Sequence, residues 1–135
     1  MRKTLTIPGD PVAKARPRVC GKATYTPTKT KNYKTLVKEL YFGKYGQTVE
    51  EMEGMLKLTV NAYFQIPKSK SKRVQEMMHT NEIRPIKRPD IDNIVKSISD
   101  ALNNVAYADD SQIVEVVAGK YYAHSPRVEI FLEKI

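Results

Sequence analysis

The segment LKLTVNAYFQI, residues 56–66, carries the clearest structural signal in the chain. Apolar side chains occupy every second position, and polar or amphipathic side chains lie between them. Because successive side chains of a strand point to opposite faces of a sheet, this alternation predicts a β-strand buried on one face. Pro67 ends the strand. Other parts of the chain must then supply the layer that covers the apolar face.

Helices are predicted on both sides of this strand. From about Thr30, apolar residues recur at the spacing of a helix with one buried face, and Thr28 or Thr30 is the expected cap. Residues 69–79 can form a short, very basic helix. A further helix follows Pro89, and its apolar face is made by Ile91, Ile94, Val95, Ile98, Leu102 and Val105.

Three more segments have the composition of strands: residues 4–7, 112–122 and 127–135. We expect residues 112–122 to be buried and to form a hairpin with residues 127–135, because only a short connection separates them. Residues 10–29 are rich in Pro and Gly and predict an irregular loop. The sum is one α+β domain over residues 1–135, with a sheet of about four strands and two or three helices.

The composition favours a polyanionic partner. The chain has 23 Lys and Arg against 15 Asp and Glu, a formal net charge of +8, which suits nucleic acid first and an anionic membrane surface second. One Cys and two His are too few for a disulfide or a zinc site. No segment approaches the about 20 apolar residues of a membrane span, and the N-terminus lacks the apolar run of a signal peptide, so a cytoplasmic location is expected.

Against this basic background, the stretch KRPDIDNIVKSISDALNNVAYADD, residues 87–110, gathers carboxylates around one helix. Pro89 keeps the residue before it extended, so Asp90 and Asp92 stand at the start of the helix. Two carboxylates there, with a third from Asp109 or Asp110, can hold Mg²⁺ against a phosphodiester, because this cation takes oxygen ligands. An EF-hand loop is excluded, since its twelfth position would be Ala101 instead of Glu.

A purely structural interpretation stays open for the same residues. An Asp at a helix N-terminus commonly caps free N–H groups and suits the helix dipole, for about 1 kcal/mol. An ADDS turn between a helix and a strand is ordinary loop chemistry. Lys96, four residues after Asp92, could contact a scissile phosphate or simply pair with Asp92 on the surface. Asp100, one turn further, could hold Lys96 in place or be a solvated helix residue.

Basic runs are spread over the whole chain, and such residues provide affinity for phosphate without sequence information. Each run alone is typical of a solvated face, but together with a carboxylate cluster the runs indicate a nuclease. The residues expected to contact DNA are Lys14, Arg16, Arg18, Lys29, Lys31, Lys70, Lys72, Arg73 and Arg88.

These motifs resemble the RusA-type Holliday junction resolvases. The resemblance rests on RPDIDNIVKSISDALN followed by ADDSQIVEV, and extends to KARPR and TYTPTKTKNY in the N-terminal half. By position it implies that Asp90, Asp92 and Asp110 are metal-binding catalytic carboxylates, with Asp109 as a supporting acid and Lys96 as the functional lysine. It further implies a compact fold with a mixed sheet, Mg²⁺ as cofactor, for which Mn²⁺ can substitute, and no small-molecule cofactor.

The resemblance also implies a homodimer, often encoded by phages or prophages, that nicks four-way DNA junctions. Two symmetric cuts suit a two-fold dimer, which presents two equivalent sites. The apolar residues of the first helix or of strand 56–66 are candidates for its interface, although core packing would account for most of them. Two other functions remain to be tested: a non-catalytic nucleic-acid-binding protein, and a metal nuclease acting on flaps, single-stranded DNA or RNA.

Overall fold

A computed structural model describes residues 1–12, 18–20, 23–25 and 28–135, with side chains described for residues 1–12 and 32–135. The elements follow the order β1 (Arg2–Pro8), β2 (Arg18–Cys20), β3 (Ala23–Tyr25), α1 (Thr28–Tyr45), β4 (Leu56–Gln65), α2 (Lys72–His79), α3 (Ile91–Ala101), η1 (Asp110–Gln112), β5 (Ile113–Ala123) and β6 (Arg127–Lys134). The described residues thus confirm the predicted α+β class, with a four-stranded mixed sheet and three α-helices. None of these helices is long and apolar enough to cross a membrane.

The sheet is ordered β1-β6-β4-β5, so the alternating strand β4 lies inside it. β4 pairs in parallel with β5 and antiparallel with β6. The predicted hairpin between β5 and β6 is therefore wrong, because β4 separates them. The connection between them passes the end of β4, where Ile66 N donates to Ala123 O at 3.0 Å. Buried and less buried side chains alternate along β6 as they do along β4. Because β6 lies between β1 and β4, the backbone groups on both of its edges are hydrogen-bonded.

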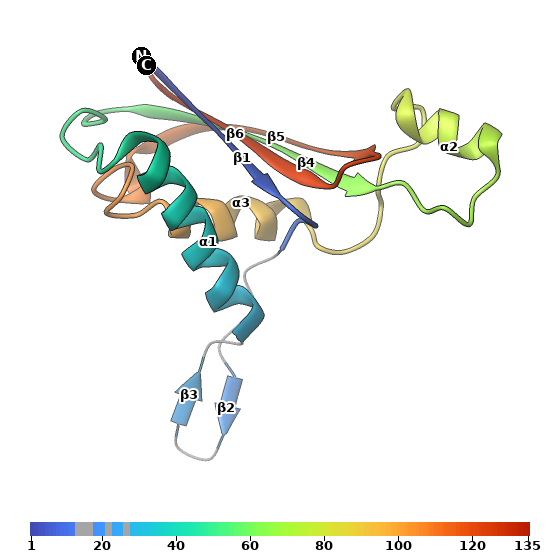
Figure 1. The fold of residues 1–135 in the computed structure, drawn as a ribbon. Helices are drawn as coiled ribbons and strands as arrows, with labels where there is room; N and C mark the ends of the chain where they lie inside the picture. Colours follow the sequence, from blue (N-terminus) through green and yellow to red (C-terminus); the bar gives the residue numbers. More distant parts are fainter. Residues whose placement is uncertain (13–17, 21–22, 26–27) are drawn as a thin grey trace.

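Two helices cover one face of the sheet. In Figure 1, α1 and α3 lie side by side beneath the strands, whereas α2 stands apart beyond the end of β4. The apolar side chains of β4 and β6 point into the layer between sheet and helices, as the alternation predicts. The largest fully buried side chains of this core are Ile7, Val37, Tyr41, Met52, Leu56, Leu58, Ile94, Ile98, Leu102, Tyr107, Ile130 and Leu132.

Strand β5 departs from its predicted burial. Val114, Val116 and Val117 are 59%, 46% and 49% exposed in the first half of β5, which is an edge strand of the sheet. A run of apolar residues is typical of a fully buried strand, but here only one long edge of β5 pairs with another strand among the described residues. The prediction that residues 112–122 form a buried strand is thus correct in type and wrong in burial.

Two smaller differences concern element boundaries. The predicted loop over residues 10–29 contains the short antiparallel strands β2 and β3. Helix α3 ends at Ala101, although the apolar spacing continues to Val105. The chain turns there, with Asn104 at φ 65°, and the following residues pack their apolar side chains from a loop. Burial imposes the spacing, and the backbone need not stay helical to achieve it.

Candidate metal centre and DNA-binding surface

The first two predicted carboxylates lie at the start of α3. Asp90 is the N-cap residue, at φ −69° and ψ 150°, and its backbone carbonyl accepts from Ile94 N at 3.1 Å. Its side chain makes no capping hydrogen bond. Asp90 and Asp92 are both exposed, while Ile94 and Ile98 on the other side of the helix are fully buried. The core therefore anchors the helix, and capping does not occupy the Asp90 carboxylate.

Lys96 lies one turn beyond Asp92 and is paired with Asp100. Lys96 Nζ is 3.9 Å from Asp100 Oδ1, and the two side chains are 60% and 15% exposed. Of the alternatives open from the sequence, the structure thus has Asp100 holding Lys96, and no ion pair joins Asp92 to Lys96 among the described residues. The distance is at the upper limit for an ion pair and the lysine is mostly exposed, so Lys96 can move toward an anion.

The other two acids lie in the turn before β5 and have different surroundings. The Asp109 carboxylate accepts from Ser111 N at 3.2 Å and caps η1, and Gln112 Oε1 in return accepts from Asp109 N at 3.2 Å. Hydrogen bonds from Ser111 hold the pKa of Asp109 below its ordinary value. Gln112 Nε2 ties this turn to the carbonyls of Met52 and Gly54, each at 3.0 Å. The Asp109 carboxylate therefore serves the turn, and Asp110 is the acid without a capping role.

Tyr107 connects this turn to helix α3. Its side chain is fully buried, and its hydroxyl donates to Ser99 O at 2.6 Å. Burial raises the pKa of Tyr107, and the charges of Asp110, Asp100 and Asp109 raise it further. The hydroxyl group of Tyr107 therefore stays protonated and remains a hydrogen-bond donor to Ser99. Sequence reasoning did not single out Tyr107, although an aromatic residue two positions before an acid pair was a possible signal.

The described residues include no group of three or more His, Cys, Asp and Glu side chains arranged to hold a metal ion. The predicted donors Asp90, Asp92 and Asp110 are all carboxylates, and oxygen donors without His or Cys fit a hard cation such as Mg²⁺. Helix α3 presents two of them to solvent, and the turn after it carries the third. Their union in one metal site stays a prediction.

Part of the predicted DNA surface belongs to the N-terminal third of the chain. Lys14 and Arg16 lie outside the described residues. Arg18 belongs to β2, and Lys29 and Lys31 belong to α1, but their side chains also lie outside the described part. The prediction for these five residues stays untested.

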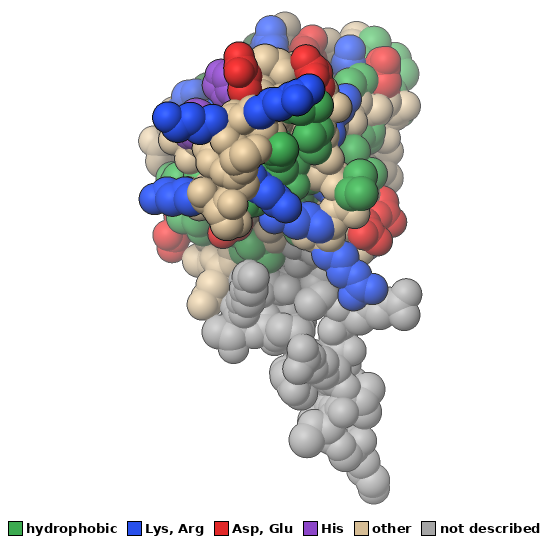
Figure 2. Space-filling model, turned by 90° about the vertical axis from the view of Figure 1, so that its right-hand side faces the viewer, with side chains coloured by type: hydrophobic (Ala, Val, Ile, Leu, Met, Phe, Trp, Pro, Cys, Tyr) green, Lys and Arg blue, Asp and Glu red, His purple; other side chains and the backbone are tan. Residues whose placement is uncertain are grey.

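The remaining predicted contacts lie around α2 and just before α3. Lys70, Lys72 and Arg73 are exposed in and just before α2, whose N-cap residue Ser71 accepts from Val74 N at 3.3 Å. Arg88 is exposed just before α3. Figure 2 views the molecule from the α2 side and shows Lys and Arg side chains spread over this face. This face therefore has the charge that a DNA backbone requires.

Comparisons with known proteins agree with these features. The family model described as "Endodeoxyribonuclease RusA" matches residues 8–133. The chain is also 36% identical over 136 residues to "Uncharacterized protein YqaN" of Bacillus subtilis (strain 168), a match that covers 96% of this chain and 94% of that protein. The family match includes the start of α3, the acidic turn and the strands β4 and β5, and it begins at the last residue of β1. The chain therefore belongs to the RusA endodeoxyribonuclease family, whose members are Holliday junction resolvases.

Proposed function

We propose that this protein is a Mg²⁺-dependent endonuclease of the cytoplasm that resolves four-way DNA junctions by paired, symmetric nicks. Nucleases of its family are generally dependent on a divalent metal ion. The observation that carries the proposal is the pair Asp90 and Asp92, exposed at the start of α3, with the Asp90 carboxylate unused for capping. A pair of carboxylates does not help a basic protein to bind DNA, but it can hold the metal ion that assists hydrolysis of the DNA backbone.

Asp90, Asp92 and Asp110 are the proposed metal ligands. When bound, Mg²⁺ lowers the pKa of a water molecule and neutralises charge on the leaving oxygen, and Mn²⁺ can replace it because it also prefers oxygen donors. Asp109 supports Asp110 by closing the turn through Ser111 and Gln112. The catalytic carboxylates thus come from two segments that Tyr107 joins.

Lys96 is the proposed partner of the scissile phosphate. It points from the same side of α3 as Asp92, since residues four apart are neighbours on a helix. Asp100 holds the ammonium when DNA is absent, at an N–O distance of 3.9 Å. A phosphate that gains charge during cleavage attracts the ammonium more strongly than Asp100 does, so the lysine acts where charge develops.

We also propose that the protein works as a homodimer, because two symmetric cuts require two equivalent sites. The apolar residues of α1 and β4 that were candidates for the interface are largely in the core: Tyr33, Val37, Tyr41 and the inward row of β4 are buried. The exposed valines of β5 support an alternative surface. They follow the acidic turn directly, and an edge strand with exposed apolar side chains is a natural place for a second copy to pack.

The proposal is tested with Asp90→Asn and Asp92→Asn, which keep the size of the side chain and remove its charge. Each should abolish cleavage of a synthetic four-way junction in Mg²⁺ while binding in EDTA persists, because basic residues provide the affinity. Glu50→Gln, a change at an exposed acid near the opposite end of the molecule, is the matched control and should cleave normally.

Four substrates should be compared side by side: junction, flap, duplex and RNA. Preference for the junction is expected. Cleavage retained by both Asp variants would refute the assigned site. Preference for flaps or RNA would mean that this nucleic acid, and not the four-way junction, is the substrate. A wild-type protein that binds DNA with strong salt dependence but cuts nothing in any divalent metal would be a non-catalytic binder.

A further inference from the structure

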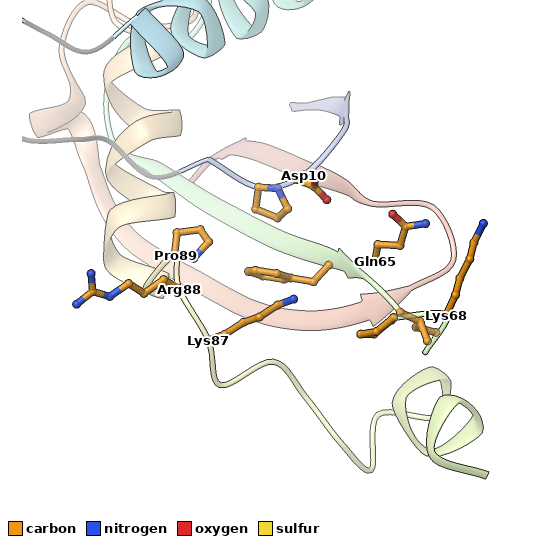
Figure 3. Close-up of a pocket in the computed structure, with 10 residues that line it drawn as sticks. Asp10, Gln65, Lys68, Lys87, Arg88 and Pro89 are labelled. Carbon is orange, nitrogen blue, oxygen red and sulfur yellow. The ribbon is translucent and has the colours of Figure 1, made fainter. Parts of the chain in front are cut away.

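A hollow of about 670 Å³ lies immediately before the start of α3. Three segments meet there: the chain after β1, the end of β4 with the residues that follow, and the loop that leads into α3. Phe64 lines the hollow, and Figure 3 shows Lys87 and Pro89 on one side and Asp10 and Gln65 on the other. Pro11, Ile66, Pro67, Lys68 and Arg88 complete the lining.

The hollow carries positive charge without acidic partners. Lys68, Lys87 and Arg88 are exposed, and no carboxylate of the described residues forms an ion pair with any of them. In Figure 3 the Lys87 ammonium points into the hollow, whereas Arg88 points outward beside α3. Cations that are left without a counterion around a concave surface attract an anionic ligand.

Lys87 is held in position before any ligand arrives. Its backbone carbonyl accepts a hydrogen bond from Lys120 Nζ at 2.5 Å. Its own ammonium lies 5.8 Å from the Phe64 ring centroid and 5.9 Å from that of Tyr122. Lys120 Nζ lies 5.2 Å from the same Phe64 ring. The Lys120 hydrogen bond therefore fixes the backbone at Lys87, and the two rings lie near its ammonium.

Asp10 limits what the hollow accepts. It is exposed on the opposite rim, and no described cation lies within ion-pair distance of it. A carboxylate repels phosphate, so an anion must lie toward Lys87 and away from Asp10. The arrangement suits one phosphate group with an uncharged portion beside it, which can contact the apolar walls formed by prolines and Ile66.

We propose that this hollow binds one backbone phosphate of the DNA strand, next to the phosphate that is cut. Pro89 lines the hollow and Asp90 is the following residue, so an occupant lies beside the candidate metal ligands without being held by them. The inference rests on the proposed function, since it presumes that the strand passes Asp90. Its role is positioning: a phosphate held by Lys87 fixes where the strand lies relative to α3.

The test is a phosphate-by-phosphate scan in EDTA, where no cleavage occurs. Four-way junctions that carry a single neutral methylphosphonate at successive positions are bound by the wild-type protein and by Lys87→Gln. We expect one position at which wild type loses about tenfold in affinity, the value of a hydrogen bond to a charged group. At that position Lys87→Gln should lose no further affinity, because the contact is already absent.

Lys134→Gln is the matched control. Lys134 ends β6 near the termini, at the opposite end of the sheet from the hollow. At 0.15 M salt its charge is screened over that distance, so its removal should not change the binding of a phosphate in the hollow. This variant should keep the wild-type interference pattern. Asp10→Asn should instead tighten binding severalfold, because the repulsion is removed.

The inference is wrong if Lys87→Gln shows the wild-type loss at every position. It is also wrong if inorganic phosphate raises the melting temperature of wild type but not of Lys87→Gln while the DNA interference is unchanged, since the hollow would then be a site for free anions. The proposed function is judged separately, by cleavage of the unmodified junction in Mg²⁺. Binding in EDTA does not depend on that outcome, so the two failures are distinguishable.

Discussion

Replacing Tyr107 by Phe removes one oxygen atom from the contact that joins α3 to the acidic turn. The Tyr107 hydroxyl donates to Ser99 O at 2.6 Å in the buried interior. Asn103, the residue that would normally donate to this carbonyl in a continuing helix, donates instead to Asp100 O at 3.3 Å. Without the hydroxyl, the carbonyl of Ser99 has no replacement donor among the described residues.

An unsatisfied buried acceptor costs about 1–3 kcal/mol, so we expect Tyr107→Phe to lower the free energy of unfolding by that amount. Cleavage should also slow, because the turn that carries Asp110 is less firmly tied to α3. Binding of junction DNA in EDTA should be nearly unchanged, since the exposed basic residues are not affected.

Tyr33→Phe is the matched comparison, because it makes the same chemical change at another buried tyrosine. The Tyr33 hydroxyl is buried and has no hydrogen-bond partner among the described residues. Removing it relieves a desolvation cost of about 1–3 kcal/mol and breaks no contact, so stability should be unchanged or higher. Cleavage should stay at the wild-type level.

Urea unfolding followed by circular dichroism measures both variants under identical conditions. The expected result is a lower midpoint for Tyr107→Phe and an equal or higher midpoint for Tyr33→Phe. Equal losses in the two variants, or an unchanged midpoint for Tyr107→Phe, would refute the reasoning from hydrogen bonding. A loss of stability without any loss of cleavage would show that Tyr107 does not position the acidic turn.

Three further predictions follow from the same contacts. Burial raises the pKa of Tyr107 and of Tyr33, so above about pH 10 the unfolded chain loses protons that the folded chain keeps. The free energy of unfolding, measured with urea, should therefore fall as pH rises, by up to about 1.4 kcal/mol per pH unit for each tyrosine. Each Phe variant should make this fall less steep. Lys96→Ala should slow single-turnover cleavage about 10–100-fold with near-normal junction binding; lost affinity with an unchanged rate would make Lys96 a docking residue. Asp109→Asn should retain measurable cleavage because Asn also caps, whereas Asp110→Asn should abolish it; the reverse order would exchange their roles.

Local patterns were sufficient for most of the elements. The alternation of residues 56–66 predicted β4, and helical spacing predicted α1, α2 and α3. These patterns succeed because burial on one face acts on neighbouring residues of the same segment. The start of α3 was equally accessible, since Pro89 directly precedes Asp90 and the first apolar position of the helix, Ile91, lies between Asp90 and Asp92.

Strand order and edge exposure were not accessible in the same way. The short connection between β5 and β6 allows either a hairpin or a passage across the end of β4. Which of the two forms depends on where β4 pairs, and in this sheet β4 lies between β5 and β6. The valines of β5 have the composition of a buried strand, but their exposure depends on the place of β5 at the edge of the sheet. Both outcomes result from competition between distant segments.

The sequence by itself determined the class of the fold, the exposed acid pair at the start of α3 and the family to which the chain belongs. Only the tertiary structure decided that Asp109 serves its own turn, that Tyr107 joins this turn to α3, and that Lys68, Lys87 and Asp10 share one hollow. The physical reason is range. Periodicity and capping act within one segment, whereas hydrogen bonding and charge act between side chains that only the folded sheet brings together.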